Sequence, residues 1–522
     1  MKIKTKKIIT ASIFGLMLNP FVGNFSTAEA EAYRSSSDTG TQIFDYIENR
    51  RREQRANALT DEQKKLLEDI EEQKQRLPKP IEKDKPIPAA FVGDDLVYNA
   101  ATGEFIATGH VDVIQLEGYR FQSEEAEGNI KTQDVRVRDK AHVLQLTPDS
   151  PRVTLDGYNT VYNYGTKIGK MGEAKGKTGD YYISGKRFEF YPDHIVVFDA
   201  TQTKCGAKIP DYHVSAERME IWPEQIIRMY KVKLWIKDKM VGKKNYEERK
   251  LDDKGETYFP RFGYNSDDGA YVEDTFEFPF KDPRFKFLIN AHINTKKGVR
   301  SNAELKYGEG GLDVTGMYGF YRDDNSNWVQ KEPGLNIYYG NKIENSPLSY
   351  GLRYEIGHWN SETAKSLHQE AEIGLTHDPI TLPGNFYLFL HTSYKITKDT
   401  HVSSRQNNGN RRINGMNYDV VLAKEFDDRF AAFAGYHYEK NNTRTALYRI
   451  NLEDYSGRFE TGISYRLTDK DRFVAGFKFD TKDGGLKDTD FYWYRDLHCS
   501  TAVWRWRHKR KKIEVHWQFT PW

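Results

Sequence analysis

The sequence predicts an all-β protein with a short helical spacer, an N-terminal β-jelly-roll and a C-terminal transmembrane antiparallel β-barrel of roughly 14 strands. Three features indicate this class. An export signal opens the chain, a strand-turn-strand unit repeats in its middle, and amphipathic strands follow one another to its end. After the signal, no apolar stretch approaches the length of a membrane-spanning helix. Any membrane-crossing segment is therefore expected to belong to a barrel, because only helices and closed barrels satisfy their backbone hydrogen bonds in lipid.

Residues 1–30 are predicted to be a secretory signal peptide. Four lysines up to Lys7 form a positive start, residues 8–22 form a short apolar core, and Ala28-Glu29-Ala30 supplies a small-x-small cleavage site. Asn19-Pro20 interrupts the apolar run, which is too short for a stable membrane span. An uncleaved membrane anchor is the alternative.

The composition sets further bounds on the class. The formal net charge of +2 gives no global attraction to nucleic acid, so no nucleic-acid partner is expected. A mean hydropathy of −0.78 together with 14% aromatic residues is typical of alternating barrel strands with aromatic girdles. A soluble, tyrosine-rich β protein would have the same composition, so the composition leaves both classes open.

Residues 33–89 are predicted to form a helical spacer and a proline-rich linker. Residues 42–77 contain no glycine or proline, and Thr60-x-x-Gln63 fits a capping box. Apolar residues recur at helical spacing, namely Leu59, Leu66, Ile70 and Leu77. Prolines then end the helix and stiffen the chain, at Pro78, Pro80, Pro86 and Pro88. A periplasmic spacer, a short coiled coil and a solvated, partly frayed helix all fit this pattern.

Residues 90–262 are predicted to form the jelly-roll. Residues 180–196 align without a gap to residues 211–227, an offset of 31 residues, and a weaker copy begins at Gly118. A single strand-turn-strand unit cannot bury its apolar face alone. Copies of it are therefore expected to stack into a solenoid or an open jelly-roll.

Corresponding positions of the two copies are apolar, and polar residues such as Glu189 and Glu220 lie between them. The matched pairs are Ile183 with Val214, Phe188 with Met219, Phe190 with Ile221, and Ile195 with Ile226. Stacked copies would carry these side chains as a continuous apolar inner stripe, which we interpret as a lipid groove. An ordinary sealed β core has the same pattern and remains the alternative.

Residues 263–522 are predicted to form the barrel. Segments of about ten residues alternate apolar and polar side chains between Gly, Asn or Asp turns, which is the pattern of outer-membrane barrels. Phe459 and Ile463, for example, alternate with Arg458 and Glu460. The chain also ends on an aromatic residue, as such barrels often do. A β-sandwich with one solvated face is the alternative.

Several motifs occur in an order that resembles one family. They are residues 199–205 followed by 209–221, the strand 109–113, the segment 258–264 with Phe278-Pro279-Phe280, and residues 494–499. Over residues 90–522 the chain resembles the lipopolysaccharide-assembly outer-membrane proteins, the LptD (OstA) family, as a variant with a short barrel. The resemblance implies a periplasmic jelly-roll whose apolar groove delivers acyl chains to an outer-membrane barrel.

The resemblance further implies an outer-membrane translocon component without enzymatic activity, cofactor or metal. It would receive lipopolysaccharide from a periplasmic bridge protein of the LptA type and insert it into the outer leaflet through a lateral gate of the barrel. Its N-terminal domain would lie in the periplasm. Large barrels of the family enclose a plug lipoprotein of the LptE type. A barrel of roughly 14 strands would be crowded by such a plug, which leaves that partner open.

Two pairs of residues are assigned specific roles. Cys205 and Cys499 are the only cysteines, and an exported pair is expected to form a disulfide, with two buried free thiols as the alternative. The resemblance implies that this bond joins the jelly-roll to the barrel. It also implies a lateral gate at Pro279 and Pro283, which fall at the first strand and turn of the predicted barrel. Proline cannot donate a ladder hydrogen bond and so weakens the seam between the first and last strands. Prolines that simply mark a strand end are the alternative.

Other functional classes fit the sequence less well. The 14 histidines form no metal-spaced cluster, and no Gly-x-Ser-x-Gly motif is present. His213-x-Ser215 lies in the predicted jelly-roll, where coincidence explains it. A general outer-membrane porin with a periplasmic domain is the main alternative, and a soluble periplasmic lipid-binding module is the third.

Overall fold

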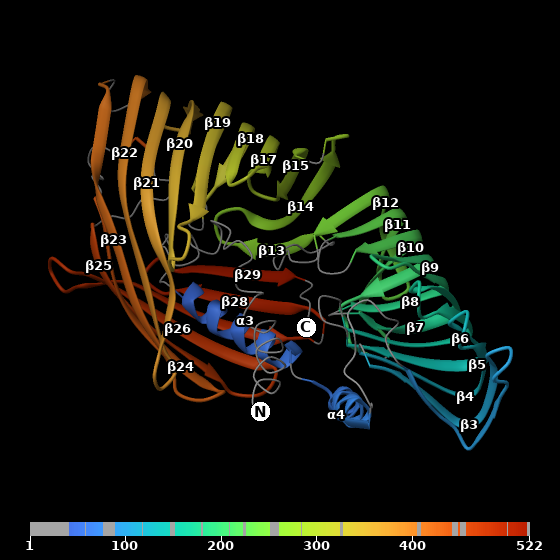
Figure 1. Cartoon of the computed structure of the whole chain (residues 1–522). Coiled ribbons are helices and arrows are strands. Elements are labelled where there is room, and N and C mark those ends of the chain that lie inside the picture. The colour runs from blue at the N-terminus through green and yellow to red at the C-terminus, as the bar shows by residue number, and fades with distance from the viewer. Residues whose placement is uncertain are drawn as a thin grey trace. The chain divides into compact units, whose positions relative to one another are not determined.

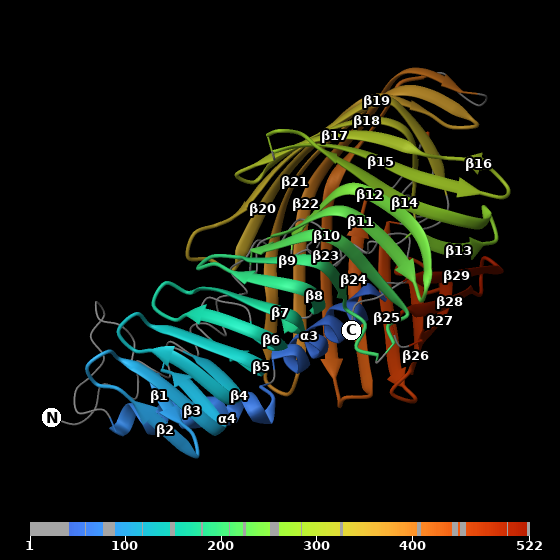
Figure 2. The same cartoon turned by 90° about the vertical axis from the view of Figure 1, so that its right-hand side faces the viewer.

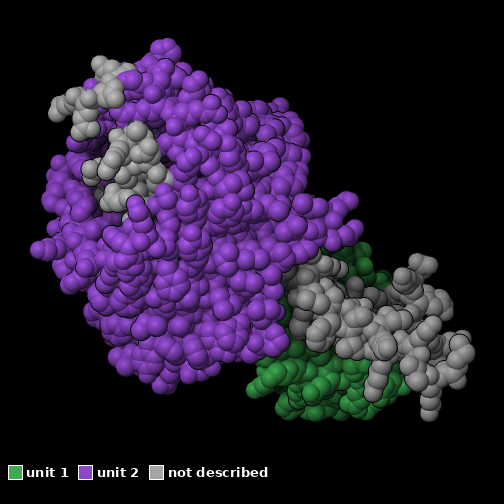
Figure 3. Space-filling model, turned by 90° about the vertical axis from the view of Figure 1, so that its left-hand side faces the viewer, with its two compact units in different colours: residues 1–17, 52–258, 519–522 green, residues 18–51, 259–518 purple. Residues whose placement is uncertain are grey.

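The structure is a computed structural model. It describes residues 41–57, 59–76, 89–116, 118–146, 152–178, 181–207, 209–222, 226–250, 260–282, 284–323, 327–404, 409–440, 447–448, 456–497 and 499–518. The predicted signal peptide, the four linker prolines and Pro283 lie outside these ranges. Two compact units divide the chain: residues 1–17, 52–258 and 519–522 in unit 1, and residues 18–51 and 259–518 in unit 2 (Figure 3).

The spacer region contains two helices, α3 (Gln42–Asn57) and α4 (Asp61–Arg76), rather than one continuous helix (Figure 1). The predicted capping box is confirmed. The backbone N–H of Gln63 donates to Thr60 Oγ1 at 3.2 Å, and the backbone N–H of Thr60 donates to Gln63 Oε1 at 3.1 Å. Because a capping residue has a non-helical backbone, Thr60 begins α4 and separates it from α3. Neither described helix is long and apolar enough to cross a membrane.

Unit 1 contains a sheet of twelve strands. They are β1 (Ala89–Val92), β2 (Asp95–Tyr98), β3 (Glu104–Gln115), β4 (Tyr119–Asn129), β5 (Asp134–Gln145), β6 (Val153–Asn163), β7 (Ile168–Thr178), β8 (Tyr181–Phe190), β9 (Ile195–Thr203), β10 (Tyr212–Trp222), β11 (Ile226–Ile236) and β12 (Lys239–Lys250). From β3 onward each strand pairs antiparallel with the next, and β1 and β2 both pair with β3 (Figure 2). We call this the open sheet, because its first and last strands do not pair with each other.

Several strands of the open sheet bend near their middle. His110 in β3 has a φ of 48° beside a shift in strand register. Asn159 in β6, Glu173 in β7 and Asp199 in β9 have similar φ values of 50°, 41° and 47°. Irregular residues of this kind bend a strand and increase its twist. Their recurrence in several strands lets a single sheet curve around an interior.

Helix α4 packs on the open sheet through one apolar face. Leu66 and Ile70 are buried against Ile114, Leu116 and Leu144, in and beside β3 and β5. A 16-residue helix alone is marginal in water, so this contact supplies most of its stability. Helix α4 is therefore docked on the sheet and is not solvated and frayed, and this packing was not among the alternatives that the sequence left open.

Charged side chains flank this apolar contact. Arg120 of β4 pairs with Asp69 of α4 at 2.7 Å, and His142 of β5 pairs with Glu62 of α4 at 2.7 Å. His142 also contacts Asp156 of β6 at 2.9 Å. Partial burial acts to raise the pKa of the Asp156 carboxyl, but the hydrogen bond and charge of His142 outweigh it and hold this pKa below its usual value.

We expect Leu66→Ala to release α4 from the open sheet. Leu66 is fully buried, and leucine-to-alanine changes at such sites cost about 2–5 kcal/mol. Hydrogen exchange read by mass spectrometry should then accelerate over residues 61–76. Lys65→Ala, which alters an exposed neighbour, is the control. Equal exchange in the two variants would contradict the packing of α4.

Unit 2 contains a closed antiparallel barrel. Its strands are β13 (Arg261–Asn265), β14 (Gly269–Pro279), β15 (Phe285–Asn294), β16 (Gly298–Val299), β17 (Asn302–Glu309), β18 (Leu312–Arg322), β19 (Trp328–Lys342), β20 (Leu348–Asn360), β21 (Ala364–Leu382), β22 (Phe386–Ser404), β23 (Arg411–Glu425), β24 (Phe430–Glu439), β25 (Gly457–Arg466), β26 (Asp471–Asp480), β27 (Leu486–Asp496), β28 (Thr501–Arg507) and β29 (Lys512–Gln518). β16 and β17 both pair with β15 and form one wall strand in two pieces, so the described wall has 16 strands. β13 pairs with β29 and closes the barrel.

The predicted number of barrel strands is too low. The wall has 16 strands, whereas the sequence predicts roughly 14. One reason is β13, which spans the boundary that the sequence predicts between the jelly-roll and the barrel, at residues 262 and 263. Its five residues are too few to display an apolar-polar alternation.

The two faces of the barrel wall differ in chemistry, as predicted. On β25, Phe459 and Ile463 are 43% and 45% exposed, whereas Arg458 and Glu460 are 1% and 0% exposed. Other strands expose large apolar residues in the same way, among them Val420, Leu422, Tyr436, Phe473, Phe491, Trp493 and Trp506. The outer face of the wall is therefore apolar, and much of the inner face is charged.

Candidate functional site

Three rows of largely apolar side chains run across the open sheet, from strand to strand. The first row is Val113, Phe121, Val143, Leu155, Gly176, Ile183, Gln202, Val214 and Leu234, one from each strand between β3 and β11. The second is Met171, Phe188, Val197, Met219 and Met229, from β7 to β11. The third is Phe190, Ile195, Ile221 and Ile227, from β8 to β11. Together they form one continuous surface, which we call the apolar stripe.

Nearly all of the predicted groove residues belong to the apolar stripe. The exception is Ile226, which pairs with Trp222, while its neighbour Ile227 pairs with Ile221 and takes the place in the row. In the first copy of the repeat, Phe190 pairs with Ile195, and the corresponding pair in the second copy would be Ile221 with Ile226. The strand pairing of the second copy is thus displaced by one residue, which an ungapped alignment cannot reveal.

A cavity of about 130 Å³ lies against the apolar stripe. Its wall includes Val113 and Val143 of the first row, Met171 of the second, and Phe190 and Ile195 of the third. Two of the predicted groove residues, Phe190 and Ile195, therefore line an open space. The other predicted residues lie outside the wall of this cavity.

The cavity also contains a polar group that the sequence analysis missed. Thr160 of β6 lines it and is 3% exposed. Among the described residues, its hydroxyl has no hydrogen-bond partner. Leaving a buried hydroxyl unpaired costs about 1–3 kcal/mol, which a ligand with a polar group could recover. Threonine is common in strands, so nothing in the sequence marks this position.

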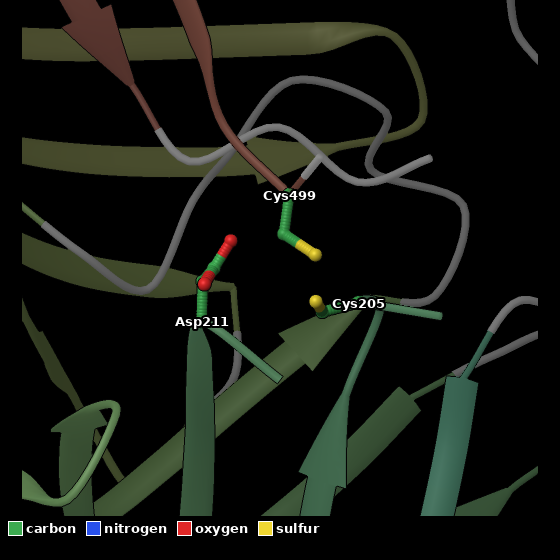
Figure 4. A group of neighbouring side chains, drawn as sticks. All are labelled: Cys205, Asp211 and Cys499. Carbon is green, nitrogen blue, oxygen red and sulfur yellow. The ribbon is translucent and has the colours of Figure 1, made fainter. Parts of the chain in front are cut away.

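Both cysteines are buried and disulfide-bonded. Cys205 is 2% exposed and Cys499 is 1% exposed. Figure 4 shows them with the side chain of Asp211. Thiolate and carboxylate groups can hold a metal such as zinc, but a disulfide sulfur is not a thiolate. We therefore do not assign these residues as a metal site.

The inner face of the barrel carries clusters of opposite charges. Glu460 of β25 contacts Arg458 of the same strand at 3.2 Å and Lys478 of the neighbouring strand β26 at 3.5 Å. Arg505 of β28 likewise contacts Asp490 and, at 3.2 Å, Glu514. Because charges of opposite sign are paired in these two clusters, this part of the inner face is polar without a large excess of either sign.

The N-terminal part of α3 lies against this inner face, within unit 2 (Figure 1). Ile43, Phe44 and Ile47 are 3%, 1% and 1% exposed. They form one cluster with barrel residues from five strands, namely Tyr387, Phe389, Val421, Ala423, Ala431, Phe433, Val474 and Tyr492. The sequence does not predict this contact, because the spacing of the three helix residues indicates an apolar face but not the surface that covers it.

A second segment packs on the inner face near the opposite ends of the strands. Leu447 and Tyr448, from the connection between β24 and β25, form a cluster with Val329, Trp359, Ala364 and Val402. The Tyr448 hydroxyl donates to the Trp359 carbonyl oxygen at 2.8 Å and lies 2.9 Å from Ser366 Oγ. Residues near both ends of the barrel wall therefore contact non-strand segments.

The closing seam of the barrel is short, and the predicted gate prolines do not lie in it. β13 and β29 share four residue pairs, residues 262–265 with 514–517, whereas β24 and β25 share nine. Pro279 pairs with Lys286 of β15 and ends β14, the second wall strand. The sequence predicts Pro279 on the first barrel strand, because the five residues of β13 are too few to show a strand pattern. Pro283 lies outside the described residues.

Comparisons with known proteins add little to this geometry. No protein-family model matches the chain, and no curated protein matches it. Two mutants of the Rhodopseudomonas blastica porin are among the similar solved structures. One is 11% identical, covers 49% of this chain and 96% of the porin, and has a TM-score of 0.29. The other, a triple mutant, is 10% identical with the same coverage and a TM-score of 0.28.

The fold itself therefore defines the class. The chain is an all-β protein with a closed 16-stranded antiparallel barrel and a separate open sheet. The open sheet carries the apolar stripe, and the barrel has an apolar outside and a charged inside. This division of surfaces is the basis of the proposal that follows.

Proposed function

We propose that this protein is an outer-membrane component that transports lipopolysaccharide to the cell surface, as members of the LptD (OstA) family do. The open sheet is then a periplasmic jelly-roll, which receives the lipid from a bridge protein of the LptA type. The barrel spans the outer membrane and inserts the lipid into its outer leaflet. The observation that carries this proposal is the apolar stripe, which is continuous from β3 to β11.

The acyl chains of lipopolysaccharide need such a surface to cross the periplasm. Burying a methylene group stabilises by ~0.8 kcal/mol, so a lipid with several acyl chains cannot cross water unshielded. Nine strands at a spacing of about 4.8 Å give the first row a length of roughly 40 Å. The unpaired hydroxyl of Thr160 would meet a polar group of the lipid within the cavity.

The barrel offers a polar passage for the sugar part of lipopolysaccharide. Sugars cannot cross hydrocarbon, so they require a polar passage such as the charged inner face. The acyl chains must leave sideways, and the four-pair seam between β13 and β29 is the gate we propose in place of the prolines. Each backbone hydrogen bond contributes only about 0.5–1.5 kcal/mol net, so a short seam is the easiest to open. The disulfide would join the jelly-roll to the barrel covalently.

Photo-crosslinking in cells tests this assignment. Benzoylphenylalanine at Phe190, which lines the cavity, should form an adduct with lipopolysaccharide. Phe198 of β9 is a matched control, because its strand neighbour Val197 belongs to the apolar stripe and alternate side chains point to opposite faces. If neither position forms an adduct, the proposed lipid path is refuted, and a general porin remains as the alternative function.

A further inference from the structure

The first ten residues of α3 present an apolar face to the inside of the barrel. Ile43, Phe44 and Ile47 follow the spacing of one helical face, and all three are buried. Phe44 packs edge-on against Phe433 of β24, with ring centroids 5.3 Å apart. The helix is thus held by specific side-chain packing and not only by its connection to the rest of the chain.

Charged residues of the same helix segment pair with the barrel wall. The pairs are Glu48 with Arg466, Asp45 with Arg472 at 3.0 Å, and Arg51 with Glu425 at 2.7 Å. Arg51 also donates to Glu48 at 2.7 Å and to the Asp427 carbonyl oxygen at 2.6 Å. The side chains of Arg51 and Glu48 are each only 7% exposed. Charges buried to this extent are tolerated only when they are paired, so helix and wall match in charge as well as in shape.

The wall beneath the helix differs from the rest of the inner face. Where other strands place ion pairs, this patch presents aromatic and aliphatic side chains such as Tyr387, Phe389 and Val421. A water-filled lumen would expose them, and contiguous exposed apolar patches usually mark a site that another element covers. Here α3 is that element.

We propose that residues 42–51 are a built-in plug of the barrel, held at the end where the short β21–β22 and β23–β24 turns lie. A 16-stranded barrel leaves a water-filled channel unless something fills it. An α-helix with its side chains is about 10–12 Å across and takes up much of that space. The chain thereby supplies from its own sequence what other barrels obtain from a separate plug protein. This inference goes beyond the proposed function and holds whether or not the cargo is lipopolysaccharide.

Planar-bilayer recording of the purified full chain tests the plug. Arg51→Glu places a negative charge against Glu425 and Glu48. This change should shift the equilibrium between bound and released helix roughly a hundredfold toward the released state. Channel conductance should rise several-fold. The charge swap Arg51→Glu with Glu425→Arg should return it toward the wild-type value. Arg76→Glu, the same change on an exposed site of α4, should leave it unaltered.

A labelling measurement keeps the test valid if Arg51→Glu does not fold. In an otherwise unchanged chain, Ile47→Cys should react with a water-soluble maleimide far more slowly than Lys65→Cys on the exposed side of α4. Equal labelling rates would overturn the plug. So would wild-type conductance in folded Arg51→Glu, or a charge swap that conducts as well as the single variant.

Discussion

Cells whose only copy of this protein carries Phe190→Glu should accumulate lipopolysaccharide before it reaches their surface. Phe190 lines the cavity and lies in the third row of the apolar stripe, paired with Ile195. A carboxylate there would have to lose its water as each acyl chain passes. That desolvation costs several kcal/mol, which corresponds to roughly a hundredfold weaker lipid binding or more.

Membrane fractionation and surface labelling of lipopolysaccharide would measure the effect. Phe198→Glu is the control, since Phe198 lies under the guanidinium of Arg187, 4.0 Å from the ring centroid, on the other face of the sheet. Heat-modifiable gel migration should show that the barrel folds in both variants. Normal surface lipopolysaccharide in Phe190→Glu would refute the lipid path but would leave the plug untouched.

Replacing either cysteine by serine should lower the free energy of unfolding by about 5 kcal/mol. Cys205 and Cys499 are almost three hundred residues apart, so an intramolecular bond between them greatly restricts the unfolded chain. Denaturation of the purified protein would measure the loss. The oxidised form should also migrate faster than the reduced form on a denaturing gel.

The double replacement provides the decisive control for the disulfide. Two residues that act only through one shared bond lose the same free energy whether one or both are changed, so their effects do not add. Cys205→Ser, Cys499→Ser and the double variant should therefore be equally stable. Additive losses, or gel mobility that does not depend on reduction, would show that each cysteine acts separately.

The apolar stripe could be predicted from the sequence because two independent patterns agree there. The two-residue alternation of a strand identifies the inner positions, and the repeat shows which of them lie side by side. Ile183 and Val214, for example, both pair with Gln202. Only the pairing across the turn after β10 was predicted wrongly, with Ile226 in place of Ile227. Strand register depends on turn geometry, which an alignment does not contain.

The strand number and the role of α3 could not be predicted, for different reasons. β13 is too short to show a pattern, so the first barrel strand and the position of Pro279 were both misplaced. Helix α3 does show an apolar face in Ile43, Phe44 and Ile47. Its binding patch, however, is assembled from residues of five strands, and only the closed barrel brings them together.

The repeat of 31 residues limits how the apolar stripe can change in length. One repeat corresponds to one hairpin, β8 with β9 in the first copy and β10 with β11 in the second. A further hairpin would extend the apolar stripe by about 10 Å and keep every inward-facing side chain inward. An extra single strand would instead reverse the chain direction and send the next segment to the wrong end of the sheet. The open sheet can therefore lengthen only by whole hairpins, in steps of about 10 Å.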